Sequence, residues 1–291
     1  MYPYEHQLLI NTAISDSSSF SFDVDDNPER WPWQNLPAYH PALAGKISFF
    51  TGFKCGEDLF EMPSGTASAV TSLSWENSGA CLSGTQAPAG KVSCKQVENR
   101  FHYNTYLYDS AGTTQQNILA QGVAFQQRDF DGWRRKMKQA IQSVDAMRPV
   151  DFGFAEPASV AVASSAEVLI SPLHENKNGL ACYGLLDKHS GFAPGHPWHS
   201  GTGDHVNAAH QLDAAWQMAH LIGRTQGWLA AGTQLICTAG EASFKNYIEL
   251  GAPFELRLKG WRPEDQGWRL SLALSQGGKP AAIIRLNLLA Q

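Results

Sequence analysis

The sequence predicts an α+β fold in which antiparallel strands surround a central helix, and three observations support this class. An apolar stripe predicts a helix at about residues 204–222. Short segments rich in Val, Ile, Leu, Thr and aromatic residues follow this helix to the end of the chain, separated by turn residues. A similar ladder of strands precedes it. The repeated ladder indicates two related units in one chain.

Composition limits the classes of function. The 291 residues suit one large domain or two of ordinary size, and 43% hydrophobic with 17% charged residues is typical of globular proteins. A net charge of −5 argues against a nucleic-acid partner. No run of about eighteen apolar residues predicts a membrane span. The five scattered cysteines lack a CxxC pair, and the N-terminus lacks a basic, apolar leader, so we expect a cytoplasmic protein.

The predicted helix carries one acid beside its apolar face. Ala209, Leu212, Trp216 and Ala219 recur every three or four residues, and Asp213 borders the stripe that they form. A carboxylate at such a position is costly unless it is paired or hydrogen-bonded. Burial raises the pKa of a carboxyl group, and a carboxyl that holds its proton near neutral pH is a useful general acid or base. The alternative is a structural Asp213 that binds a nearby backbone amide.

A histidine precedes this acid at a suggestive spacing. His199 lies fourteen positions before Asp213, in a turn rich in Gly, Pro and His, and Thr202 or Asp204 is a candidate helix cap. A loop histidine can therefore reach toward an acid about two turns into the helix. Such a pair suits the removal or placement of a proton beside a carbonyl group.

The segment Leu212-Asp213-Ala214-Ala215-Trp216-Gln217, with His199 before it and Gly227-Trp228 after it, resembles the decanoyl-type β-hydroxyacyl-carrier-protein dehydratases. The resemblance implies a double hot-dog fold, in which each curved sheet would wrap a helix. It implies His199 as base, Asp213 as acid, and Gln217 as the residue that orients Asp213. It further implies that the substrate contacts His205, Ala208, Trp216 and Gln217, and that the Ala208 amide polarises the thioester carbonyl.

The same resemblance bears on cofactors and partners. It implies a substrate carried by an acyl carrier protein, or an acyl-CoA, in fatty-acid or polyketide biosynthesis. No dissociable cofactor is implied, because the phosphopantetheine arm belongs to the substrate. Hot-dog proteins typically form dimers that pair across sheet edges. Two units in one chain can cover their own edges, so the sequence leaves both a monomer and a homodimer as alternatives.

A second family offers a different reaction. The run Asp204-His205-Val206, with an acid eight positions after the histidine, resembles the A-factor synthase family of double hot-dog proteins. The segments Phe244–Tyr247 and Leu119–Ala124 extend this likeness. It implies transfer of a β-ketoacyl chain to a small hydroxylated acceptor, with His205 in place of His199. A third reading is a non-catalytic acyl-binding subunit, because Asn207-Ala208 replaces the Pro-Gly that the dehydratases have before the helix.

Four segments are predicted. Residues 1–60 are an irregular N-terminal arm, 61–150 a first hot-dog-like unit, 151–165 a linker, and 166–291 the second unit with the active site. The first unit is predicted to be degenerate, since it shows no comparable central helix. His40 and the residues after it faintly resemble the first active-site segment of polyketide dehydratase domains. No acid on a following helix completes a site, so we interpret His40 as structural.

The remaining motifs indicate ordinary structure. His196, His199, His205 and His210 lie within fifteen residues but form no HExxH or comparable ligand set, so no metal site is predicted. A helix is predicted over 129–144, and its basic run 134–138 is a solvated face or, alternatively, a surface for an acidic carrier protein. The expected strands are 69–75, 91–96, 101–108, 118–127, 166–172, 180–186, 233–237, 242–247, 254–261, 268–275 and 281–289.

Overall fold

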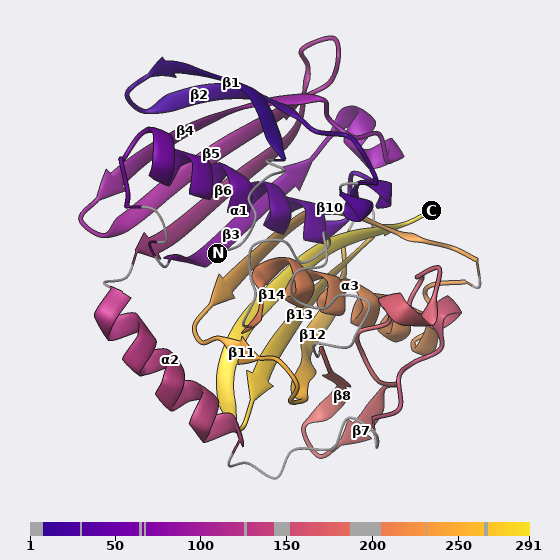
Figure 1. Cartoon of the computed structure of the whole chain (residues 1–291). Helices are drawn as coiled ribbons and strands as arrows, with labels where there is room; N and C mark the ends of the chain where they lie inside the picture. Colours follow the sequence, from indigo (N-terminus) through magenta and orange to yellow (C-terminus); the bar gives the residue numbers. More distant parts are fainter. Residues whose placement is uncertain are drawn as a thin grey trace. The chain divides into compact units, whose positions relative to one another are not determined.

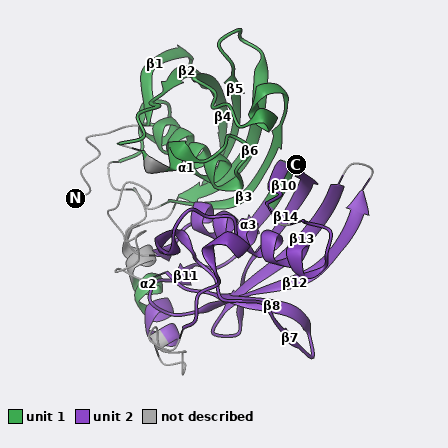
Figure 2. Cartoon of the chain, turned by 90° about the vertical axis from the view of Figure 1, so that its right-hand side faces the viewer, with its two compact units in different colours: residues 1–135, 238–241 green, residues 136–237, 242–291 purple. Residues whose placement is uncertain are grey.

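The computed structural model describes residues 8–29, 31–63, 66, 68–124, 127–142, 152–186, 205–230, 232–264 and 267–291. The chain forms two compact units (Figures 1 and 2). The first comprises residues 1–135 and 238–241, and the second comprises residues 136–237 and 242–291. Each unit has an antiparallel sheet and a long buried helix, so the α+β double hot-dog class is confirmed. Within the described residues, no helix is long and apolar enough to cross a membrane.

The strands of the first unit pair in the order β1-β2-β4-β5-β6-β3. Side chains on β5 alternate between buried and partly exposed, as expected for a strand with one face on a core. Phe101, Tyr103, Thr105 and Leu107 are its buried residues. The strand bounds are β1 (Leu9–Asp16), β2 (Ser19–Val24), β3 (Ser68–Asn77), β4 (Ala89–Val97), β5 (Arg100–Tyr108) and β6 (Thr114–Ala124).

The central helix of the first unit is α1 (Pro41–Asp58), which contacts β5, β6 and β3. His40 caps this helix, since its Nδ1 accepts a hydrogen bond from the Ala42 amide at 3.3 Å. The predicted irregular arm at residues 1–60 is therefore wrong: it contains β1, β2 and α1. The first unit is not degenerate either, because it has its own buried helix.

The physical reason for this error lies in the composition of α1. Its buried positions include the polar residues Lys46, Ser48 and Thr51 beside apolar ones, so no apolar stripe stands out and the usual periodicity is missing. Lys46 is buried there, and its amine has no hydrogen-bond partner among the residues that the structure describes. Burial lowers the pKa of this amine to about 7. Gly52 also weakens the helical signal, but a Cβ at this position would approach the Tyr103 ring to 3.3 Å, so a small residue suits the contact.

The sheet of the second unit has the order β10-β14-β13-β12-β8-β7. Most of its buried positions are apolar; Leu270, Leu272 and Ile284 are examples with no exposed surface. The strand bounds are β7 (His174–Asn176), β8 (Gly179–Gly184), β10 (Leu235–Phe244), β12 (Phe254–Glu264), β13 (Gly267–Gln276) and β14 (Lys279–Ala290). The two strands expected at 233–237 and 242–247 are thus one continuous strand, β10.

The central helix of the second unit is α3 (Ala208–Thr225), which lies across β14, β13 and β12 (Figure 1). Asn207 caps it by accepting a hydrogen bond from the His210 amide at 3.0 Å. The helix begins about four residues later than predicted, because His205–Val206 forms a short strand, β9, that pairs with β11 (Ile248–Glu249). Every residue from Ala209 to Gly223 is buried.

The predicted linker at 151–165 differs from the structure over its described residues. Phe152, Ala155 and Val160 are buried, and the Ala155 amide donates to the Ile170 carbonyl at 2.9 Å. Buried apolar residues of this kind belong to a core, so the segment is part of the second unit. It contains the short helix η4 (Pro157–Ser159).

Local structure elsewhere differs from the prediction in smaller ways. The expected strand at 166–172 is instead the short helix η5 (Ser165–Glu167), followed by one isolated bridge from Ile170 to Gly184. The helix predicted over 129–144 is α2 (Gln127–Gln142). Two further short helices are η1 (Pro32–Asn35) and η2 (Gly79–Ser83).

Candidate functional site

Asp213 is the buried acid of α3. It lies in the buried part of the helix, and the residue is only 5% exposed. Burial raises the pKa of its carboxyl group, a hydrogen bond from Gln217 lowers it, and the negative charge of Glu167 raises it; together these effects give a pKa of about 7. The predicted increase in pKa is thus confirmed. Near neutral pH this group is present both as acid and as carboxylate.

Gln217 lies one turn after Asp213 and is fully buried. Its Nε2 donates to Asp213 Oδ1 at 3.2 Å and to the Glu167 carbonyl oxygen at 2.9 Å. Its Oε1 accepts from the Leu169 amide at 2.9 Å. Both N–H groups of this amide are in use, so Gln217 is held in one orientation and holds Asp213 in turn. A direct bond from this amide to a substrate would have to replace one of these contacts.

The segment bound by Gln217 comprises residues 163–170, which we call the strap. Its end is fixed to β8, because the Leu185 amide donates to the Leu169 carbonyl at 3.0 Å and Ile170 bridges to Gly184. Sequence reasoning did not assign the strap to the site. Glu167 lies 46 positions before Asp213, and no spacing pattern connects two residues so far apart.

His199, the predicted base, lies outside the described residues, and its pairing with Asp213 stays a prediction. His205 is described, but it is not in the first turn of the helix as predicted. It belongs to β9, opposite Glu249 of β11, and its ring meets the Tyr247 ring edge-on with centroids 4.3 Å apart. Backbone pairing therefore fixes the position of His205.

Ala208 is the first residue of α3 and is partly exposed. The first amides of a helix lack partners within the helix, and the helix dipole makes this end attractive to a developing negative charge. Trp216 lies more deeply buried than Ala208, with 4% of its surface exposed. Its ring meets the His220 ring edge-on, with the ring centroids 5.0 Å apart. Trp216 is thus buried, and the substrate contact that the resemblance implies for it stays a prediction.

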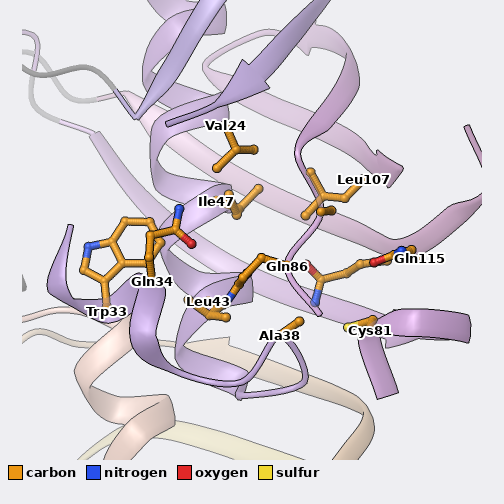
Figure 3. A pocket seen from close by; sticks show the side chains of 12 residues that line it. Val24, Trp33, Gln34, Ala38, Leu43, Ile47, Cys81, Gln86, Leu107 and Gln115 are labelled. Atoms are coloured by element: carbon orange, nitrogen blue, oxygen red, sulfur yellow. The ribbon is translucent and has the colours of Figure 1, made fainter. Parts of the chain in front are cut away.

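A small cavity of about 20 Å³ lies in the first unit (Figure 3). Leu43 and Ile47 of α1 line it together with Leu107 of β5, and Gln86 and Gln115 add polar groups. This volume holds about one water molecule, which is too little for an acyl chain. In the described part of the chain, no group of three or more His, Cys, Asp or Glu side chains is arranged to hold a metal ion.

Solved structures share this fold over nearly the whole chain. The dehydratase domain from the CurJ module of the curacin polyketide synthase matches with a TM-score of 0.55 and 11% identity, over 98% of this chain and 96% of that one. The dehydratase domain of RzxB from Pseudomonas fluorescens matches with a TM-score of 0.50 and 12% identity, over 98% of each chain. An acyl-CoA thioesterase II from Mycobacterium marinum matches with a TM-score of 0.49 and 10% identity, over 97% and 96%.

No protein-family model matches this chain, and no curated protein matches its sequence. At identities of 11–12% the likeness to the two dehydratase domains shows a shared fold and leaves the reaction to be argued from the site.

Proposed function

We propose that this protein is a dehydratase that removes water from β-hydroxyacyl thioesters carried by an acyl carrier protein. The observation that carries the proposal is Asp213, a buried acid with a pKa of about 7 that Gln217 holds in one orientation. A general acid works best when its pKa lies near the operating pH. The dehydratase domains that share the fold support the same reaction class.

Dehydration requires an acid and a base at neighbouring carbon atoms. A base removes the proton from the α-carbon, electrons of that C–H bond form the new double bond, and the β-hydroxyl leaves as water after it gains a proton. In this proposal Asp213 supplies that proton and His199 accepts the α-proton. The amide of Ala208, at the start of α3, polarises the thioester carbonyl, where negative charge develops.

The proposal needs no dissociable cofactor, because the phosphopantetheine arm that bears the thioester arrives with the substrate. The partner is therefore an acyl carrier protein, or acyl-CoA as a minimal substitute. Fatty-acid and polyketide biosynthesis are the pathways in which such substrates arise.

A second candidate is β-ketoacyl transfer to a hydroxylated acceptor, with His205 in the role of base. The observation in its favour is the fixed position of His205, which the β9–β11 pairing and the Tyr247 ring hold just before α3. The two candidates make different products from different substrates, so they can be separated directly.

Mass spectrometry of acyl-carrier substrates tests both candidates. A panel of β-hydroxyacyl and β-ketoacyl chains on holo carrier protein is incubated with the protein, with and without glycerol-like acceptors. Loss of water from a β-hydroxyacyl chain supports the dehydratase, and movement of a β-ketoacyl chain to the acceptor supports the transferase. Release of free acid indicates a thioesterase, and an unchanged panel indicates a non-catalytic acyl-binding subunit.

The assay compares two acid-to-amide variants of the second unit, of which the second is the matched control. Asp213→Asn is expected to abolish the loss of water. Glu175→Gln changes an exposed acid on β7 and is expected to leave the product pattern unchanged. Equal activity of Asp213→Asn and the unaltered protein would reject the role of Asp213.

A further inference from the structure

Two of the free cysteines, Cys55 of α1 and Cys94 of β4, meet in the core of the first unit. The register of the sheet places Cys94 directly opposite Tyr103 of β5. Both residues are buried, with 5% and 9% of their surfaces exposed. Directly opposed residues share a face of a sheet, so both side chains are on the face that packs against the core.

Two contacts fix how α1 lies on β5. The Thr105 hydroxyl donates a hydrogen bond to Thr51 Oγ1 at 3.4 Å. A Cβ at Gly52 would approach the Tyr103 ring to 3.3 Å, so the helix passes closest to the sheet at this point. Cys55 follows Gly52 by three residues, which places it on the same side of the helix. Cys55 has no exposed surface, so its side chain is enclosed between α1 and the sheet.

The two thiols are therefore neighbours across the boundary between helix and sheet. The Cys55 thiol donates a hydrogen bond to the sulfur of Cys94. The Tyr103 hydroxyl senses the charge of both sulfur atoms, so the three side chains form one cluster. The remaining cysteines lie on other elements, namely Cys81 in η2, Cys182 in β8 and Cys237 in β10.

This cluster lies at the margin of the core. β2 pairs with β4 as far as Ser93, and the Cys94 amide donates to the Ser18 carbonyl at 2.8 Å, in the turn between β1 and β2. The next residues of β4, Lys95–Val97, are exposed. Cys55 likewise lies in the last turn of α1. A reagent as small as a peroxide therefore has only a short distance to cross from the surface of the unit to the sulfur of Cys94.

The hydrogen bond between the thiols makes them chemically different. It lowers the pKa of Cys94, although burial and the charge of Asp16 oppose this effect. The same hydrogen bond raises the pKa of Cys55, and burial raises it further. A thiolate is the reactive form of cysteine towards oxidants. Cys94 is therefore the thiol that reacts first, and Cys55 is placed to react with the product.

We propose that Cys55 and Cys94 are an oxidation site, which a hydroperoxide converts into a disulfide between α1 and β4. The Cys94 thiolate attacks one peroxide oxygen, the O–O bond breaks, and the other oxygen leaves with a proton as water or alcohol. Cys94 is then a sulfenic acid. The Cys55 sulfur attacks the Cys94 sulfur, the S–O bond breaks, and the leaving hydroxide takes the Cys55 proton to form water. The two thiols lose two electrons, and the peroxide gains them.

This site is independent of the proposed dehydratase reaction, because both cysteines belong to the first unit and Asp213 belongs to the second. The bridge would fasten the last turn of α1 to the sheet. In a reducing compartment such a bridge is transient, and a dithiol opens it again by exchange.

Peptide mapping of the whole protein tests the proposal. The reduced protein is treated with hydrogen peroxide, remaining thiols are alkylated after unfolding, and the digest is analysed by mass spectrometry without reduction. The expected product is one linked pair of peptides that contain Cys55 and Cys94, lighter by two hydrogen atoms than the free pair and separated again by dithiothreitol. Folded, peroxide-treated protein in which both thiols stay free, or are oxidised without becoming linked, would overturn the proposal.

Variants test the order of the two steps. In Cys55→Ser no second thiol is available, so the Cys94 sulfenic acid should accumulate and be trapped by dimedone. In Cys94→Ser dimedone should label Cys55 much less, since the pKa of that thiol is raised. Equal labelling of the two variants would contradict the assignment of Cys94 as the reacting thiol. Cys81→Ser is the matched control in the same unit and should form the bridge like the unaltered protein.

The thermal midpoint gives a second readout. Oxidation should raise the midpoint of the unaltered protein and of Cys81→Ser by about 5 °C or more, the scale of a new cross-link. Cys55→Ser and Cys94→Ser should show no such rise. If either of these variants does not fold, the linked peptides of the unaltered protein still decide the proposal, since that experiment requires no substitution.

Discussion

Gln217 donates one hydrogen bond to Asp213 at 3.2 Å, and the remaining polar atoms of its amide bind the backbone on either side of Val168. One buried amide therefore orients the candidate acid and fastens the strap. The two tasks have different experimental signatures, since the first affects a pKa and the second affects stability.

Gln217→Leu is expected to raise the pKa of Asp213, because the lost hydrogen bond favoured the ionised form. The variant should also unfold more easily, by about 1–3 kcal/mol, since the Leu169 amide and the Glu167 carbonyl lose their partner. Carbon NMR of the carboxyl group measures the first effect, and urea unfolding measures the second. Gln211→Leu is the matched control: this buried glutamine of α3 binds the Val206 carbonyl at 3.0 Å, so its loss should reduce stability and leave the pKa of Asp213 unchanged.

Asp213→Asn should change the dependence of stability on pH. The carboxyl pKa is about 7 in the folded chain and near its ordinary 3.8 when unfolded. The folded state therefore binds more protons between these values, and the unaltered protein should lose stability as pH rises from about 4 to 7. The asparagine variant lacks this dependence. Urea unfolding at pH 5 and pH 8 compares the two, and a fall of equal size in both proteins would exclude Asp213 as its source.

The same variant should lose catalytic rate by about a hundredfold or more, the usual scale for a lost acid–base group. A rate that stays normal, together with a sharp drop in the thermal midpoint, would instead identify Asp213 as a structural acid.

His220→Phe tests a buried histidine with no catalytic assignment. Within the described part of the chain, neither ring nitrogen has a hydrogen-bond partner. The ring meets Trp216 edge-on, a contact that phenylalanine can keep. Burial and the nearby charge of Arg224 lower its pKa to about 3 from an ordinary 6.5. The unfolded chain therefore binds more protons in this range, and stability falls as pH drops from 6.5 to 3.

The phenylalanine variant should lose less stability than the unaltered protein as the pH drops, so it should stay folded to a lower pH. Unfolding midpoints at pH 4 and pH 7 measure the effect. His174→Phe, at a partly exposed ring stacked on Tyr183 of the same unit, is the control that should leave the acid sensitivity in place.

The sequence predicts the second unit better than the first for a physical reason. In α3 an apolar stripe with one acid is visible in the spacing, and turn residues separate the strands that follow. In α1 polar and small residues such as Lys46, Ser48 and Gly52 interrupt the apolar spacing, so the periodicity does not show the helix. The sequence does not predict the contact between the strap and Asp213. This contact consists of the hydrogen bonds of Gln217 to two segments far apart in the sequence, which form only when the chain folds.

The last prediction separates His199 from His205, and with them dehydration from acyl transfer. A base must come within hydrogen-bond reach of the proton that it removes. His205 is fixed on β9 beside Tyr247, and its place before the helix suits a residue that contacts the substrate. In the dehydratase, His199→Ala should abolish turnover and His205→Ala should lower it less. Both variants are assayed on the same β-hydroxyacyl and β-ketoacyl carrier substrates, after circular dichroism shows that each is folded. The reverse ranking, with His205→Ala inactive and His199→Ala near normal, would overturn the dehydratase assignment and favour the transferase.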